Sequence, residues 1–117
     1  MKKLTFNEFQ HIMAYNTSAN ETCIEIEFSI DNHTEYSAAN LGKTVDIKTN
    51  EIIYWFGLTE DGSQAYEFDT FEKFSSAKIF QGESIRDIWD LVSFYSIDAC
   101  EVEERLPFYF SKNGNRD

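Results

Sequence analysis

Two cysteines and two histidines are the residues of this sequence best suited to nucleophilic or metal chemistry. Cys23, Cys100, His11 and His33 lie in four separate segments. A thiol beside an imidazole can act as a nucleophile, and a cluster of both types can bind zinc. Neither the spacing of a zinc motif nor a C-x-x-C is found. Only the fold could assemble a Cys23–His33 or Cys100–His11 pair, so the sequence predicts neither catalysis nor a metal site.

Carboxylates are the other group that could do chemistry. Neighbouring acids such as Asp87 and Asp90 could flank a substrate in the way that glycosidase carboxylates do. In a chain with 21 acidic residues, however, such neighbours arise by chance. The sequence also lacks a glycine-rich phosphate loop, a G-x-S-x-G motif and a twelve-residue calcium loop. We expect no enzyme and no cofactor, and a small hydrolase that uses surface carboxylates is the weakest of the functions considered.

Charge is the strongest global feature. The 117 residues include 21 acidic and 10 basic ones, which gives a net charge of -11. Such a charge repels nucleic acid and anionic lipid, and it attracts basic protein surfaces. We therefore expect no direct nucleic-acid or membrane partner. Solubility alone is the simpler explanation of the acidity.

The acidic excess is confined to two stretches of the chain. Residues 21–35 and residues 51–70 contain no lysine or arginine. Their acids are Glu21, Glu25, Glu27, Asp31 and Glu35 in the first stretch, and Glu51, Glu60, Asp61, Glu67 and Asp69 in the second. Both stretches coincide with predicted strands and turns, so we expect the charge on the polar face of a sheet.

Length and patterning favour one α+β domain over residues 1–110, followed by a disordered tail, 111–117. Two cysteines do not make a disulfide framework, and both are expected to be buried or half-buried. The sequence shows no signal peptide and no run of about 20 apolar residues, so a cytoplasmic location is expected.

The first half of the chain predicts a helix and a meander of about five strands. Thr5 and Glu8 have the spacing of a capping box, which predicts a helix that ends near residue 16. Apolar and polar residues alternate over 24–30, which predicts a strand with Glu25 and Glu27 exposed. Further strands are predicted over 34–39, 44–48, 52–58 and 64–68, with residues 41–43 as a break.

The second half predicts two or three helices and a further strand. Asp69 with Glu72 would cap a helix that ends before Gly82. Ser84 with Asp87 would cap the most regular one, in which Ile85, Ile88, Trp89 and Val92 share an apolar stripe. A short strand is predicted over 94–97, and a last helix from Asp98 to Leu106 that ends at Pro107.

The strand 52–58 carries apolar residues on both faces, although one buried face of a sheet requires them on one face only. In the strand 52–58, Ile53 and Trp55 lie opposite the face that carries Tyr54 and Phe56, so they are either covered or form an exposed patch. The segment 108–110, Phe-Tyr-Phe, is likewise either docked on the domain or available to a partner.

These patterns favour a small protein-binding inhibitor whose acidic sheet occupies a basic cleft of a nuclease or another nucleic-acid-binding protein. Glu25 and Glu27 would stand about 6.7 Å apart, close to two base steps of DNA. In size and charge the chain is similar to the acidic inhibitors of phages and mobile elements, such as anti-CRISPR proteins and nuclease-immunity proteins. The alternative is an accessory or homodimeric domain whose acidity serves solubility. The predicted partner-binding residues are Glu25, Glu27, Asp31, Glu35, Ile53, Trp55, Glu60, Asp61 and Glu67.

Overall fold

The computed structural model describes residues 2–14, 23–33, 36, 39–46 and 48–110. Helix α1 (Phe6–Ala14) is followed by four strands, β1 (Cys23–Ile30), β2 (Ala39–Val45), β3 (Ile52–Gly57) and β4 (Ala65–Phe68). Helix α2 (Phe71–Ser76) comes next, and then β5 (Val92–Ile97), β6 (Cys100–Glu101) and α3 (Val102–Tyr109). The predicted α+β class is confirmed. The expected helix end near residue 16, most of the strand expected over 34–39 and the expected tail 111–117 lie outside the described residues.

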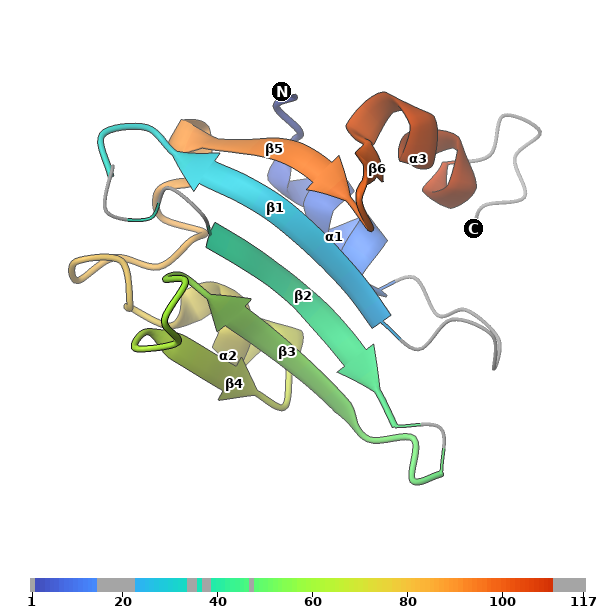
Figure 1. Ribbon diagram of the computed structural model, residues 1–117, viewed down its shortest axis with the longest axis horizontal. Coiled ribbons are helices and arrows are strands. Elements are labelled where there is room, and N and C mark those ends of the chain that lie inside the picture. Colours follow the sequence, from blue (N-terminus) through green and yellow to red (C-terminus); the bar gives the residue numbers. More distant parts are fainter. Residues whose placement is uncertain (1, 15–22, 34–35, 37–38, 47, 111–117) are drawn as a thin grey trace.

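The strands form one six-stranded sheet in the order β4-β3-β2-β1-β5-β6. All the strand pairs are antiparallel. Figure 1 shows β5 beside β1, although some sixty residues separate the two strands in the sequence. The described meander thus has four strands, β1 to β4, where about five are expected, and the sheet also contains β5, predicted over 94–97, and β6, which the sequence does not predict.

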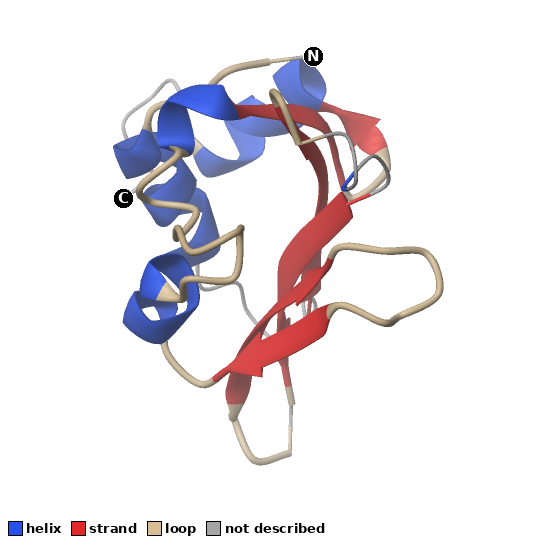
Figure 2. Ribbon diagram, turned by 90° about the vertical axis from the view of Figure 1, so that its left-hand side faces the viewer, coloured by secondary structure: helices blue, strands red, loops and turns tan. Residues whose placement is uncertain are grey.

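The helices cover one face of this sheet. Figure 2 shows the helices on one side and the opposite face of the strands without a helix. The core lies between the two layers and is rich in rings: Phe9 stacks on Trp89 with centroids 4.7 Å apart, and Phe56 stacks on Phe74 at 4.2 Å. Burial of these apolar surfaces is the main favourable term in folding.

Local signals at the start of the chain are confirmed. The Thr5 N–H donates to Glu8 Oε1 at 2.9 Å, and the Glu8 N–H donates to Thr5 Oγ1 at 3.0 Å, as a capping box requires. In β1, Ile24, Ile26 and Phe28 are buried while Cys23, Glu25 and Glu27 are exposed. The register predicted from the alternation is therefore right.

The predicted break at residues 41–43 is wrong. Strand β2 runs unbroken from Ala39 to Val45, across the expected break and into the strand expected from residue 44. Gly42 interrupts the sequence pattern, but it is paired with Glu25 on one side and Trp55 on the other. A glycine inside a strand often marks a close approach of another group rather than an end.

The predicted helix that begins at Ser84 is also wrong. Ser84 and Asp87 do exchange the expected hydrogen bonds, each at 3.0 Å, but only turns and a short 3₁₀ helix, Trp89–Leu91, follow. From Val92 onward the backbone pairs with β1, opposite Ile30. Pairing in the sheet thus overrides the local helical pattern. Of the expected stripe, Ile85, Ile88 and Val92 are buried, and Trp89 is half-buried against the core.

Two helix boundaries differ from expectation. Thr70, not Asp69, caps α2, because its Oγ1 accepts from the Lys73 N–H at 3.1 Å. Helix α3 contains Pro107 instead of ending before it, and it begins at Val102, beyond the expected cap Asp98. Tyr109 in the last turn is buried and its hydroxyl accepts from Arg105, which holds the helix together past the proline.

The C-terminal aromatic segment is partly docked. Tyr109 is buried, whereas Phe108 is 41% exposed. The ring of Phe110 stacks on His11 with centroids 4.6 Å apart, and His11 Nε2 lies 3.0 Å from the Tyr109 carbonyl oxygen.

The expectation that both cysteines are buried or half-buried is wrong, since Cys23 and Cys100 are exposed and no disulfide joins them.

Candidate protein-binding face

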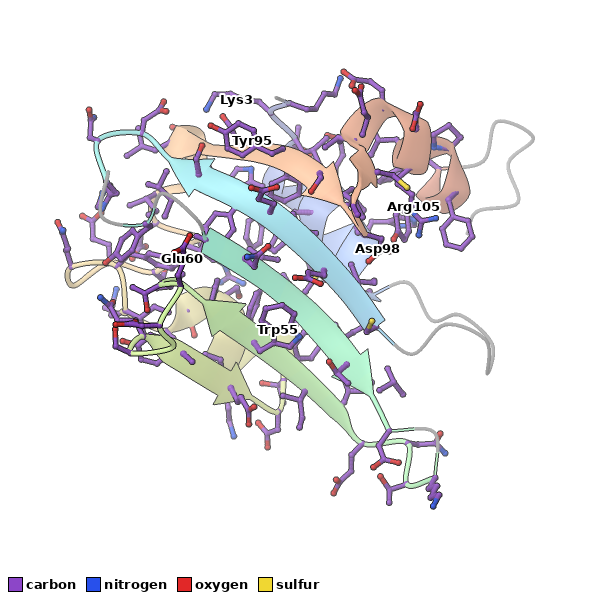
Figure 3. The ribbon with its side chains drawn as sticks, in the orientation of Figure 1. Lys3, Trp55, Glu60, Tyr95, Asp98 and Arg105 are labelled. Carbon is purple, nitrogen blue, oxygen red and sulfur yellow. The ribbon has the colours of Figure 1, made fainter. Side chains whose placement is uncertain are left out.

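The strand register places two rows of residues on the face of the sheet that the helices leave uncovered. The first row runs across four strands as Glu25, Gly42, Trp55 and Glu67. The second runs across all six as Glu101, Ser96, Glu27, Asn40, Gly57 and Ala65. We call these ten residues, together with Ile53, the open face. Figure 3 views the molecule from this side.

The charge of the open face is entirely negative. Each acidic residue of the strands lies on it and is exposed, namely Glu25, Glu27, Glu67 and Glu101. The one basic residue of the strands, Lys43, pairs with Ile24 and Tyr54 on the helix-covered face. Lys43 is 5% exposed, and burial lowers the pKa of its ammonium group. Lys43 therefore offers no positive charge to the open face.

Trp55 occupies the middle of this face. Its indole ring reaches from β3 across β2, and Figure 3 shows it there on the viewer's side. A Cβ atom built on Gly42 would lie 2.6 Å from Trp55 Cζ2 and 2.9 Å from Cε2, so the ring rests directly on the glycine. Ile53, two residues earlier, is 38% exposed. Of the two alternatives that the sequence leaves open, burial or exposure, the structure places Trp55 half-buried and Ile53 exposed.

Two further predicted acids border the open face. Glu60 and Asp61 lie in the β3–β4 turn, which Figure 2 shows projecting on the side away from the helices. Asp61 Oδ1 accepts from the Ser63 N–H at 3.0 Å. This bond, with others from the Ser63 and Thr59 side chains, lowers the pKa of Asp61, which keeps its carboxylate ionised. Asp31 is exposed in the turn after β1, and Glu35 lies outside the described residues.

Asp98 fixes the position of Glu25. Its Oδ1 accepts from the Glu25 N–H at 2.9 Å, and its own N–H donates to the Glu25 carbonyl at 2.7 Å. The Arg105 guanidinium pairs with Asp98 Oδ2 at 3.1 Å and donates to Tyr109 Oη at 3.2 Å. Figure 3 shows this pair beside the end of β5. Helix α3 thus holds the strand that carries the acids.

Groups that could support catalysis are kept apart or used structurally. Strand β1 separates Cys23 from the turn that leads to His33 by about 24 Å of extended chain. A groove of about 580 Å³ lies between the N-terminal segment and Trp89. Three of its polar side chains make contacts within the fold: Lys3 donates to the Asp90 carbonyl, the Trp89 indole N–H donates to the Leu4 carbonyl, and Glu8 caps α1. Among the described residues, no group of three His, Cys, Asp or Glu could hold a metal ion.

The sequence does not predict six members of the open face, and Glu101, Gly42 and Ser96 show why. Glu101 was hidden because β6 is only two residues long and shows no alternation. Gly42 was read as a break, although a glycine opposite a tryptophan in a paired strand is a signal of ring-on-backbone packing. Ser96 donates to Glu27 Oε1 at 3.4 Å, a contact that depends on the β1–β5 pairing and has no local signal.

No protein-family model matches the chain, and no curated protein or solved structure is significantly similar to it. None of the described helices is long and apolar enough to cross a membrane.

Proposed function

We propose that this chain is a non-catalytic protein-binding domain that docks its open face onto a basic surface of a larger protein. The observation that carries the proposal is the segregation of charge by the sheet: the acids of the strands are exposed on one face, and Lys43 is buried under the other. Opposite charge steers association, and Trp55 supplies the aromatic anchor that such interfaces need.

The finer proposal is inhibition by competition with nucleic acid. Glu25 and Glu27 stand on one rigid strand about 6.7 Å apart, near two base steps of a DNA strand. A cleft that normally holds phosphates would accept carboxylates at this spacing. The partner in this proposal is a nuclease or another nucleic-acid-binding protein, as with anti-CRISPR or immunity proteins, and the link to those proteins is one of size and charge only.

Self-association through the open face is the alternative, because Ile53 and Trp55 offer apolar surface there. Such a dimer would bring Glu25, Glu27 and their copies close together. Like charges that face each other across an interface weaken binding by roughly 2 kcal/mol or more. The arrangement of charge therefore favours a basic partner over a second copy.

Charge reversal tests the proposal. In the double variant Glu25→Lys/Glu27→Lys, two attractions become two repulsions while the core is untouched. The matched control is Glu103→Lys/Glu104→Lys, which makes the same change of charge at exposed positions of α3. Partners are captured from source-cell extract with wild type and both variants, and the binding kinetics of each captured protein are then measured.

The proposal expects a partner that wild type and the α3 variant bind alike and that the β1 variant binds at least about ten-fold more weakly, mainly through slower association. Elevated salt should reduce the difference. Displacement of nucleic acid from that partner would support the inhibitory function. Equal binding by both variants would show that the open face is not the docking surface.

A further inference from the structure

The way in which Trp55 is held suggests which basic side chain the open face accepts. Gly42 has no side chain, and the indole rests against its backbone, with Cζ2 and Cε2 2.6 and 2.9 Å from the position that a Cβ would take, too close for any side chain. A ring that lies on a glycine in this way has one side supported by the sheet. Trp55 is only half-buried, so part of its surface is left to solvent.

Carboxylates stand on both sides of this ring. Glu25 is the partner of Gly42 on β1, and Glu67 is the partner of Trp55 on β4. With neighbouring strands about 4.8 Å apart, Glu25 and Glu67 are about 14 Å apart at the backbone, with the ring between them. Both side chains are exposed. A cation on the ring over Gly42 would lie one strand from Glu25, and Glu67 stands beyond it on the other side of β3.

We propose that Trp55, Glu25 and Glu67 form a receptor for an arginine side chain of the basic partner, an inference that rests on the proposed function. A guanidinium is planar and weakly hydrated, so it can stack on an indole and pair with a carboxylate in the same plane. A lysine ammonium is a compact, strongly hydrated charge and gains less from a flat ring. The receptor thus distinguishes arginine from lysine, which net charge cannot do.

The experiment uses blocked tetra-arginine and tetra-lysine peptides, which carry equal charge. Trp89→Phe leaves Trp55 as the one tryptophan, since the chain contains two. Titration should change Trp55 fluorescence saturably with tetra-arginine and give an affinity about two- to five-fold higher than with tetra-lysine, as expected for an exposed cation–π contact. If Trp89→Phe folds poorly, the indole N–H resonance of Trp55 in the unmodified protein gives the same reading.

Two variants assign the preference to the receptor. Trp55→Leu keeps an apolar side chain and should abolish the preference for arginine. Glu25→Gln/Glu67→Gln should weaken the binding of both peptides. Equal affinities for the two peptides in wild type would overturn the arginine receptor, and so would a preference that survives Trp55→Leu. In either case the acidic docking face would still be supported if both peptides bind in a salt-dependent way and Glu25→Lys/Glu27→Lys abolishes that binding. Binding that this variant does not change would contradict the proposed function itself.

Discussion

At the residue scale, Gly42 is the position where the open face tolerates no change. A Cβ there would lie 2.0 Å from the Ile24 carbonyl oxygen as well as against the Trp55 ring. Gly42→Ala should therefore destabilise the fold by about 1–3 kcal/mol or more, the usual cost of overpacking. Chemical denaturation measures this change.

Gly57 provides the matched control for that prediction. It lies on the same face in β3, and a Cβ there would meet Trp55 Cζ3 at 4.0 Å, an ordinary contact. Gly57→Ala should be neutral or stabilising by up to about 1 kcal/mol, because alanine has less conformational freedom to lose. Equal effects at Gly42 and Gly57 would show that the ring does not rest on Gly42.

Asp98 is the second residue on which the open face depends. Its φ of 53° is left-handed, a conformation that aspartate and asparagine tolerate better than alanine. Asp98→Ala loses the bonds to Glu25 and Arg105 and should cost about 2 kcal/mol or more. Asp98→Asn keeps the turn and an acceptor and should cost less. Thermal unfolding of both variants checks this order, and the reverse order would exclude the Asp98 contacts as its cause.

At the element scale, Trp89 joins the segment after Ser84 to helix α1. Its ring stacks on Phe9, and its indole N–H donates to the Leu4 carbonyl at 2.7 Å. Trp89→Ala should destabilise the protein by about 3 kcal/mol, somewhat less than for a fully buried tryptophan. Trp89→Phe keeps a stacked ring and should cost about 1 kcal/mol, mainly for the lost hydrogen bond. Urea unfolding distinguishes the two, and an unchanged midpoint for Trp89→Ala would contradict the packing described.

Asp87, in the turns between α2 and β5, should make the stability of the fold depend on pH. The Ser84 backbone N–H, the Lys78 ammonium and the Ser84 hydroxyl lower the pKa of Asp87 in the folded state. A lowered pKa means that the stabilisation is present above the ordinary value of 3.8 and is lost as pH falls through the folded value. Asp87→Asn should destabilise the protein at pH 7, and the difference from wild type should shrink steadily as pH falls below 3.8. A difference that stays constant as pH falls would rule out the ionised carboxylate as its source.

How far the sequence predicts these elements depends on where their signals lie. Helix α1 and strand β1 carry their own capping and alternation, and both are predicted within two residues of their observed ends where the structure describes them. The helix expected after Ser84 fails because Val92 is paired in the sheet with Ile30, far away in sequence. The candidate site follows the same rule: Glu25, Glu27 and Trp55 are found from local alternation, whereas Glu101 and Gly42 need the register.

At the scale of the whole molecule, the acids of the strands and Trp55 share one face of the sheet, whereas the net charge of -11 belongs to the whole chain. Exposed acids are available elsewhere for comparison, including Asp69, Glu103 and Glu104. A cationic ligand attracted by net charge alone would visit these acids as often as those of the open face. A ligand recognised by the open face would not.

The most direct test is nuclear magnetic resonance mapping of a titration with the blocked tetra-arginine peptide at physiological salt. Specific docking should shift the backbone amides of Glu25, Glu27, Gly42 and Glu67 and the Trp55 indole N–H, with little change at the α3 acids. Glu25→Lys/Glu27→Lys should remove these shifts, whereas Glu103→Lys/Glu104→Lys should leave them. Shifts of equal size at Asp69, Glu103 and Glu104 would contradict a specific open face.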